Sequence, residues 1–141
     1  MNAPLEMIRI TDGRDVDTLH LVIEGMVNTG EGSLDLAQLI EVYEENAKNP
    51  STFLAYANNG RGPVGYIYTV LRESPKGLIW VIEQIYSEEP YVGKGLYILA
   101  ETWARSNGAV SIRAITSPNK AEAMARLFEI DVIGIVIGKE F

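Results

Sequence analysis

The chain has 141 residues, 47% hydrophobic and 22% charged, a composition typical of one globular domain spanning 1–141. It has no cysteine and a single histidine, His20, which excludes disulfides, thiolate metal sites and multi-histidine metal centres. The formal charge of −7 disfavours nucleic-acid binding. With neither a membrane-spanning apolar run nor a signal pattern in view, we expect a cytoplasmic protein that does not bind membranes.

The first half of the chain predicts a strand, two helices and a hairpin. Asp12 or Asp15 can cap the first helix and Ser33 the second, while the glycine-rich turn at 58–62 joins two strand-like runs. The expected elements are a strand at Met7–Thr11, helices at Asp15–Val27 and Leu34–Ala47, and strands at Ser51–Asn58 and Val64–Arg72.

The second half predicts a strand, a glycine-containing loop and an amphipathic helix, followed by further elements. The strand is Leu78–Tyr86 and the loop is Ser87–Gly95. The helix begins near Lys94 and ends at Asn107-Gly108, a pair that favours a left-handed cap. Its predicted buried stripe is Leu96, Leu99, Ala100 and Trp103. After it we expect a strand at Ala109–Thr116, a helix at Lys120–Phe128 and a closing strand at Val132–Ile137.

This order predicts an α/β layered fold with a mixed, mostly antiparallel central sheet and helices on both faces. Short turns give an antiparallel meander in the middle of the chain. The helix that connects Leu78–Tyr86 to Ala109–Thr116 makes those two strands parallel, because a crossover returns the chain in the same direction.

The acidic residues are concentrated near the N-terminus, with ten acidic and three basic residues in 1–50 and nine of each thereafter. Such a face could attract a cationic partner, although a solvated helix surface explains it equally simply.

The glycine loop is the candidate ligand site. A strand that enters a helix through glycines aims backbone N–H groups and the positive end of the helix dipole at one point, which suits a phosphate. A plain strand–helix turn is the alternative.

The element order and the second half of the chain resemble the GNAT superfamily of acyl-CoA-dependent N-acetyltransferases. The family loop, Gln/Arg-x-x-Gly-x-Gly/Ala, is similar to Pro90-Tyr91-Val92-Gly93-Lys94-Gly95. Asn119, followed by a short helix ending in Leu127-Phe128, resembles the family's Asn…Leu-Tyr element. The ending VIGIVIGKEF resembles compact members, including divergent ones encoded by bacteriophages.

The resemblance implies that acetyl-CoA lies between two splayed strands. Its pyrophosphate would meet the amides of the glycine loop, its pantetheine arm would follow the strand from Ile85 to Ser87, and Asn119 and Phe128 would lie beside the arm. The loop amides are those of Val92, Gly93, Lys94, Gly95 and Leu96. No metal is implied. The reaction is acetyl transfer to an amine of unknown identity, on a small molecule or a protein.

The resemblance also implies catalytic roles. A strand glutamate often acts as the base, and Glu83 is the acidic residue of the central strand. Burial among apolar neighbours would suit it to that task, while a solvent-facing glutamate is the alternative. The usual tyrosine that protonates the thiolate is replaced by Phe128, so Tyr86, Tyr91, Tyr97 or water would substitute.

Pro90 and Val92 also depart from the family pattern, since the loop usually carries basic or amide side chains there. A phage-associated GNAT-fold binding or structural protein that turns over slowly or not at all is therefore the alternative function. The short tail after Phe128 has room for one strand only, which would leave an exposed sheet edge and favour a homodimer.

Overall fold

The computed structural model describes residues 5–29, 35–115, 126, 131–133 and 136–141. Within this part of the chain, no helix is both long and apolar enough to cross a membrane. In chain order the elements are β1 (Glu6–Ile10), the 3-10 helix η1 (Gly13–Leu19), α1 (His20–Asn28), α2 (Leu36–Asn46), β2 (Thr52–Asn58), β3 (Pro63–Ser74), β4 (Gly77–Ser87), α3 (Pro90–Ser106), β5 (Ala109–Ile115), β6 (Asp131–Ile133) and β7 (Val136–Glu140).

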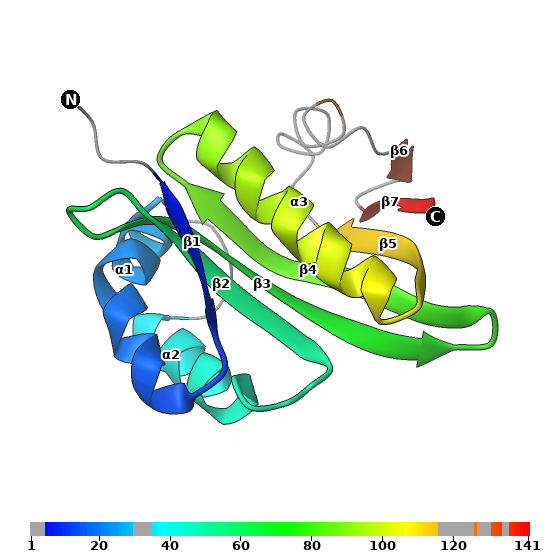
Figure 1. Ribbon diagram of the computed structural model, residues 1–141, viewed down its shortest axis with the longest axis horizontal. Coiled ribbons are helices and arrows are strands. Elements are labelled where there is room, and N and C mark those ends of the chain that lie inside the picture. The colour runs from blue at the N-terminus through cyan, green and yellow to red at the C-terminus, as the bar shows by residue number, and fades with distance from the viewer. Residues whose placement is uncertain (1–4, 30–34, 116–125, 127–130, 134–135) are drawn as a thin grey trace.

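One twisted sheet of seven strands runs through the molecule, in the order β1-β2-β3-β4-β5-β7-β6. The β4–β5 pair is parallel, and every other neighbouring pair is antiparallel. Figure 1 shows α3 lying across the sheet as the connection between the two parallel strands. The predicted mixed, mostly antiparallel sheet is therefore confirmed.

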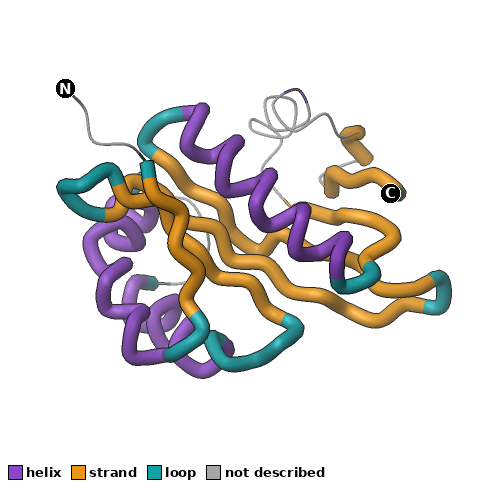
Figure 2. The backbone as a smooth tube through the Cα atoms, in the orientation of Figure 1, coloured by secondary structure: helices purple, strands orange, loops and turns teal. Residues whose placement is uncertain are grey.

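Each face of the sheet carries its own apolar core, so helices cover both faces as expected (Figure 2). On one face, α3 packs on alternate residues of the inner strands, with Trp80 and Leu96 fully buried. On the other face, η1, α1 and α2 pack on the intervening residues, which include Leu54, Tyr66 and Tyr68. The period-two alternation of β2 and β3 thus separates the two cores.

Helix α3 begins four residues before the predicted start. It starts at Pro90, which favours the first helical position because its missing N–H needs no partner there. It ends as predicted at Asn107, and Gly108 has a φ of +93°. The buried stripe differs from the predicted one, because Leu99 is 37% exposed while Val92 and Tyr97 are buried.

The two N-terminal helices also depart from their predicted boundaries. The first begins as the 3-10 turn η1, capped by Asp12, whose carboxylate accepts from the Arg14 N–H at 3.0 Å. The second is capped by Asp35, not by Ser33, which lies outside the described residues. Asp35 and Gln38 form a reciprocal capping box, in which each side chain accepts from the other residue's N–H. A short polar side chain that precedes a helix does not by itself reveal which candidate is the cap.

The C-terminal tail forms two short strands, which corrects the prediction of one. β7 pairs with β5, and β6 pairs back onto β7 at the sheet edge. The tail therefore has room for a hairpin after all, because each strand is very short. The predicted helix at 120–128 lies outside the described residues apart from residue 126. The predicted homodimer stays a prediction.

Two buried threonines differ in whether their hydroxyl groups are hydrogen-bonded, and this difference gives a stability test. The Thr69 hydroxyl is buried and has no hydrogen-bond partner among the described residues, whereas the Thr52 hydroxyl donates to the carbonyls of Asn46 at 2.6 Å and Asn49 at 2.8 Å. We expect Thr69→Val to raise the free energy of unfolding by about 1 kcal/mol, and Thr52→Val to lower it by about 1–2 kcal/mol. Urea unfolding measures both, and the reverse order would contradict this assignment.

Candidate active site

The site begins at an irregularity in β4. Tyr68 of β3 pairs with Gln84, and the next residue, Thr69, pairs with Ile82, so Glu83 is the extra residue of a β-bulge. The bulge interrupts the alternation of side chains along β4. As a result Glu83 and Gln84, although consecutive, both line the groove on the α2 side of the sheet.

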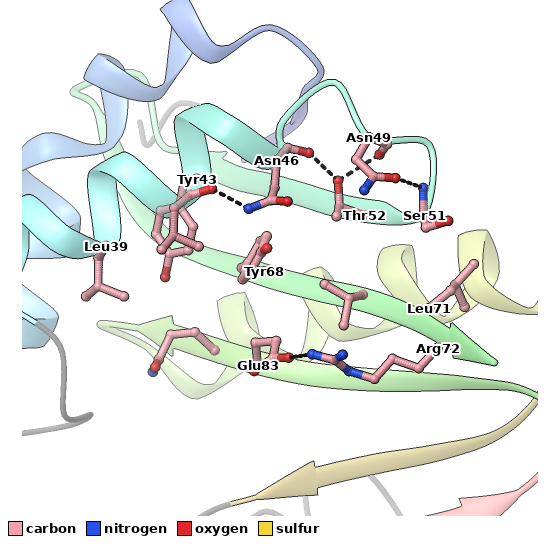
Figure 3. A pocket seen from close by; sticks show the side chains of 13 residues that line it. Leu39, Tyr43, Asn46, Asn49, Ser51, Thr52, Tyr68, Leu71, Arg72 and Glu83 are labelled. Carbon is pink, nitrogen blue, oxygen red and sulfur yellow. Dashed lines mark hydrogen bonds and ion pairs between the residues drawn. The ribbon is translucent and has the colours of Figure 1, made fainter. Parts of the chain in front are cut away.

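That groove has a volume of about 550 Å³ and lies between α2 and the strands β3 and β4 (Figure 3). This volume falls within the range of small-molecule sites. Apolar side chains from α2 and β3 form one part of its lining, and polar side chains form the rest. The lining residues are Leu39, Val42, Tyr43, Asn46, Asn49, Ser51, Thr52, Tyr68, Val70, Leu71, Arg72, Glu83 and Gln84.

Glu83 is paired rather than buried. Its Oε1 accepts a hydrogen bond from Nη2 of Arg72 at 3.0 Å, and its side chain is 38% exposed. Figure 3 shows Arg72 reaching along the sheet to this carboxylate. Of the two alternatives for Glu83, the buried one is therefore wrong and the solvent-facing one fits. The nearby residues Ile82 and Ile85 pack in the core under α3, while the bulge leaves Glu83 in the open groove.

Two tyrosines, Tyr43 and Tyr68, line the groove, and Tyr43 is hydrogen-bonded to a third, Tyr66. The hydroxyls of Tyr43 and Tyr66 lie 3.0 Å apart and share a hydrogen bond. Burial raises the pKa of both far above the usual range of a phenol. Burial, and then the nearby Glu83 carboxylate, raise the pKa of Tyr68 as well. These phenols therefore stay protonated at neutral pH and can serve as donors, not as bases.

Three of the polar lining residues, Asn46, Asn49 and Thr52, form hydrogen bonds with the backbone around the end of α2. Asn46 donates from Nδ2 to the Val42 carbonyl at 2.8 Å. Asn49 accepts at Oδ1 from the Ser51 N–H at 2.9 Å, and Thr52 donates to the two carbonyls already named. These contacts hold together the turn from α2 to β2 and leave Arg72 and Glu83 as the charged pair of the groove.

The β4–β5 pairing ends level with the groove. The parallel register runs from Leu78↔Ala109 to Ile82↔Ala114, whereas β4 continues to Ser87. The backbone of residues 83–87 therefore has no β5 partner in this register on that side. Ile85 packs toward α3, and Ser87 donates from Oγ to the Glu89 carbonyl at 2.9 Å. The predicted cofactor residues Ile85 and Ser87 lie on this unpaired stretch.

The predicted glycine loop is the first part of α3, not a loop. The N–H groups of Val92 and Gly93 already donate to the Glu89 carbonyl, at 3.1 and 3.4 Å. Those of Lys94, Gly95 and Leu96 lie within the helix, where the backbone bonds to the preceding turn. The helix start has no side-chain cap.

Gly93 and Gly95 both lie close to side chains from other elements of the fold. A Cβ on Gly93 would come within 2.8 Å of the Ser87 Oγ, and one on Gly95 within 2.8 Å of the Met7 Cε. Val92 is fully buried, which explains why an arginine would not fit there, while Lys94 is exposed.

The other predicted site residues are only partly brought together. Tyr86 lies on the same side of the sheet as Glu83 but packs toward α1, with its hydroxyl 3.6 Å from where a Cβ on Gly25 would be. Asn119 and Phe128 lie outside the described residues.

Sequence reasoning missed Arg72, Tyr68 and Gln84, because their meeting with Glu83 depends on the register and the bulge. Among the described residues, no cluster of His, Asp or Glu could hold a metal ion.

No protein-family model and no curated protein matches the chain by sequence. Solved structures do match by shape. A GNAT-family acetyltransferase from Streptococcus pneumoniae superposes with a TM-score of 0.75 at 13% identity, covering 98% of this chain and 100% of that one. The PaiA N-acetyltransferase from Thermoplasma acidophilum, solved with coenzyme A, gives a TM-score of 0.69 at 15% identity, covering 98% and 99%.

An aminoglycoside acetyltransferase from an uncultured soil sample, solved with sisomicin, gives a TM-score of 0.67 at 15% identity and covers 92% of this chain and 93% of that one. Matches at sequence identities this low support the assignment of the fold only, not of a substrate or an activity. The likeness to phage-encoded members stays a prediction. Because these matches extend over nearly the whole chain and agree with the order of its helices and strands, the chain has the fold of the GNAT acetyltransferases.

Proposed function

We propose that this protein is an N-acyltransferase that transfers an acetyl group from acetyl-CoA to an amine. One observation carries the proposal: the bulge puts the Glu83 carboxylate in an open groove at the point where β4 parts from β5. An amine in the groove and a thioester in the gap between the strands would meet beside that carboxylate.

In the proposed reaction, Glu83 accepts the proton that the attacking amine loses, directly or through a water molecule. The amine nitrogen bonds to the thioester carbonyl carbon, the C–S bond breaks, and its electron pair leaves with the sulfur. Either Tyr86 or water then protonates the thiolate to give free CoA. Tyr68 adds a protonated hydroxyl to the groove wall and is a second candidate donor.

The acetyl-CoA is proposed to lie along Ile85–Ser87, whose backbone has no β5 partner, and to place its pyrophosphate at the start of α3. There the helix dipole and the exposed Lys94 favour negative charge. Because the amides of Val92 and Gly93 bond to Glu89, a phosphate would have to displace that contact or bind at the preceding turn. Asn119 and Phe128 remain proposed neighbours of the pantetheine arm.

A second candidate is a GNAT-fold protein that binds its ligand without efficient turnover. The observation in its favour is the charge at the start of α3, where the exposed carboxylates of Glu88 and Glu89 oppose a phosphate and the family's basic positions hold Pro90 and Val92. Affinity for acetyl-CoA and turnover are therefore tested separately.

The first test concerns acetyl-CoA affinity. We expect Lys94→Glu to raise the Kd for acetyl-CoA about tenfold, because reversing a charge near the phosphates costs on the order of 1–2 kcal/mol. Lys76→Glu, an equal change in the exposed β3–β4 turn, should leave the Kd unchanged. Isothermal titration calorimetry measures both. If wild-type protein shows no binding at millimolar acetyl-CoA, both the enzyme and the CoA-binding proposals fail.

The second test concerns turnover. We expect Glu83→Gln to lower kcat/KM about 10²–10⁴-fold, since the amide cannot accept a proton, while the Kd for acetyl-CoA stays the same. Glu73→Gln, on the neighbouring strand outside the groove, is the matched control. Release of free thiol across a panel of amines gives the rates. Equal rates for Glu83→Gln and wild type would remove Glu83 from the mechanism.

A further inference from the structure

We propose that the acceptor is a small zwitterion with an apolar body, in which an anionic group lies close to the amine and is recognised by Arg72. This inference rests on the proposed function, because calling the ligand an acceptor assumes acyl transfer. Its first test, however, is a binding measurement that needs no turnover. The feature that carries it is the pairing of one cation and one anion inside an otherwise neutral groove.

Arg72 is placed as a ligand-binding residue, not as a support of the fold. Its side chain is 64% exposed, and one terminal nitrogen makes the contact with one oxygen of Glu83. An exposed pair of this kind adds little to stability. The guanidinium fork has further donors on its other nitrogens, and their planar arrangement matches a carboxylate or a phosphoryl group.

Glu83 likewise has capacity for a ligand. Its second oxygen, Oε2, is not the one held by Arg72, so an ammonium group could meet it while Arg72 stays in place. An amine without an anionic group would bring its positive charge close to Arg72, and an anion without an amine would meet Glu83. A ligand that carries both charges a few bonds apart satisfies the pair.

The rest of the lining does not compete for charge. Asn46, Asn49 and Thr52 are engaged with the backbone at the end of α2. Leu39, Val42 and Val70 offer an apolar surface on which an aliphatic or aromatic body can lie, with the Tyr68 ring beside them. Figure 3 shows Leu39 on α2 and Tyr68 on the strand next to the one that carries Glu83.

Among the described residues, none of the acidic side chains of the first third of the chain lines this groove. Glu41 and Glu44 of α2 line a different hollow, together with His20 and Asp35. Within the described residues, Glu83 is the one carboxylate that lines the groove, and Arg72 balances it. The sequence-based lean toward a purely cationic acceptor therefore loses its support, and a zwitterion fits the groove better.

Three ligands that share one carbon skeleton test the inference: leucine, leucinamide and 3-methylbutylamine. The amide lacks the negative charge, and the amine lacks the whole anionic group. We expect calorimetry on the full chain to show leucine binding about tenfold more tightly than either, as one charge-assisted contact provides. The phosphonate analogue of leucine then separates a carboxylate site from a phosphoryl site, and tight binding of either supports the inference.

Arg72→Gln should weaken leucine binding about tenfold, and leucinamide binding should stay the same or become tighter, because the substitution removes the cation that repels its ammonium group. Arg61→Gln, in the exposed β2–β3 turn, is the matched control and should change neither. If Arg72 merely positions Glu83, the substitution will weaken leucine and leucinamide equally. Equal weakening of leucine and leucinamide would overturn the inference. So would equal affinities of the wild-type protein for leucine and leucinamide, or no binding of any of the ligands at tens of millimolar.

The same ligands used as acceptors keep the two proposals distinguishable. With acetyl-CoA present, Arg72→Gln should raise KM for leucine and leave kcat largely unchanged, because the contact is made before the chemical step. If acetyl-CoA does not bind or no thiol is released, the proposed acyltransfer fails. The calorimetric ranking of leucine over leucinamide, and its loss in Arg72→Gln, still decides the zwitterion inference by itself.

Discussion

The backbone of β4 is hydrogen-bonded to β3 along nearly its whole length but to β5 along only its first half, and the position of the site depends on that asymmetry. A strand in the middle of a sheet normally has both edges filled. From Glu83 to Ser87, the β4–β5 register of the described residues pairs no residue of β5 with β4. The bulge at Glu83 lies where the parallel pairing stops, which puts a carboxylate next to unpaired backbone.

The two faces of the sheet perform different tasks. Under α3, the side chains are close-packed, with Trp80, Leu96 and Ile112 fully buried, and this face holds the strands in place. On the other face, a groove remains between α2 and the strands β3 and β4. Keeping Glu83 and Arg72 in that groove, half in solvent, avoids the desolvation that a buried ion pair would suffer. The two charged side chains can therefore contact a ligand although folding did not require their full desolvation.

Local patterns were sufficient where a feature depends on neighbouring residues. The hairpin turn and the Asn107-Gly108 cap were both predicted from adjacent residues. The start of α3 was misplaced because glycines at 93 and 95 resemble a loop. In the structure both lie in the helix, Gly93 close to Ser87 of β4 and Gly95 close to Met7 of β1. The sequence left open whether Glu83 is buried or faces solvent, because Ile82 and Ile85 nearby are apolar. Those two residues pack under α3, whereas Glu83 and Gln84 line the groove on the other face.

By itself, the sequence determined the layered α/β fold and the parallel crossover through α3, because periodicity, turn residues and residue type act locally. Only the tertiary structure decided that β4 carries a bulge, that Arg72 reaches Glu83 from the neighbouring strand, and that both lie in a groove beneath α2. The physical reason is that register is a property of two strands at once. A shift of one residue moves a side chain to the other face, and no single segment encodes that shift.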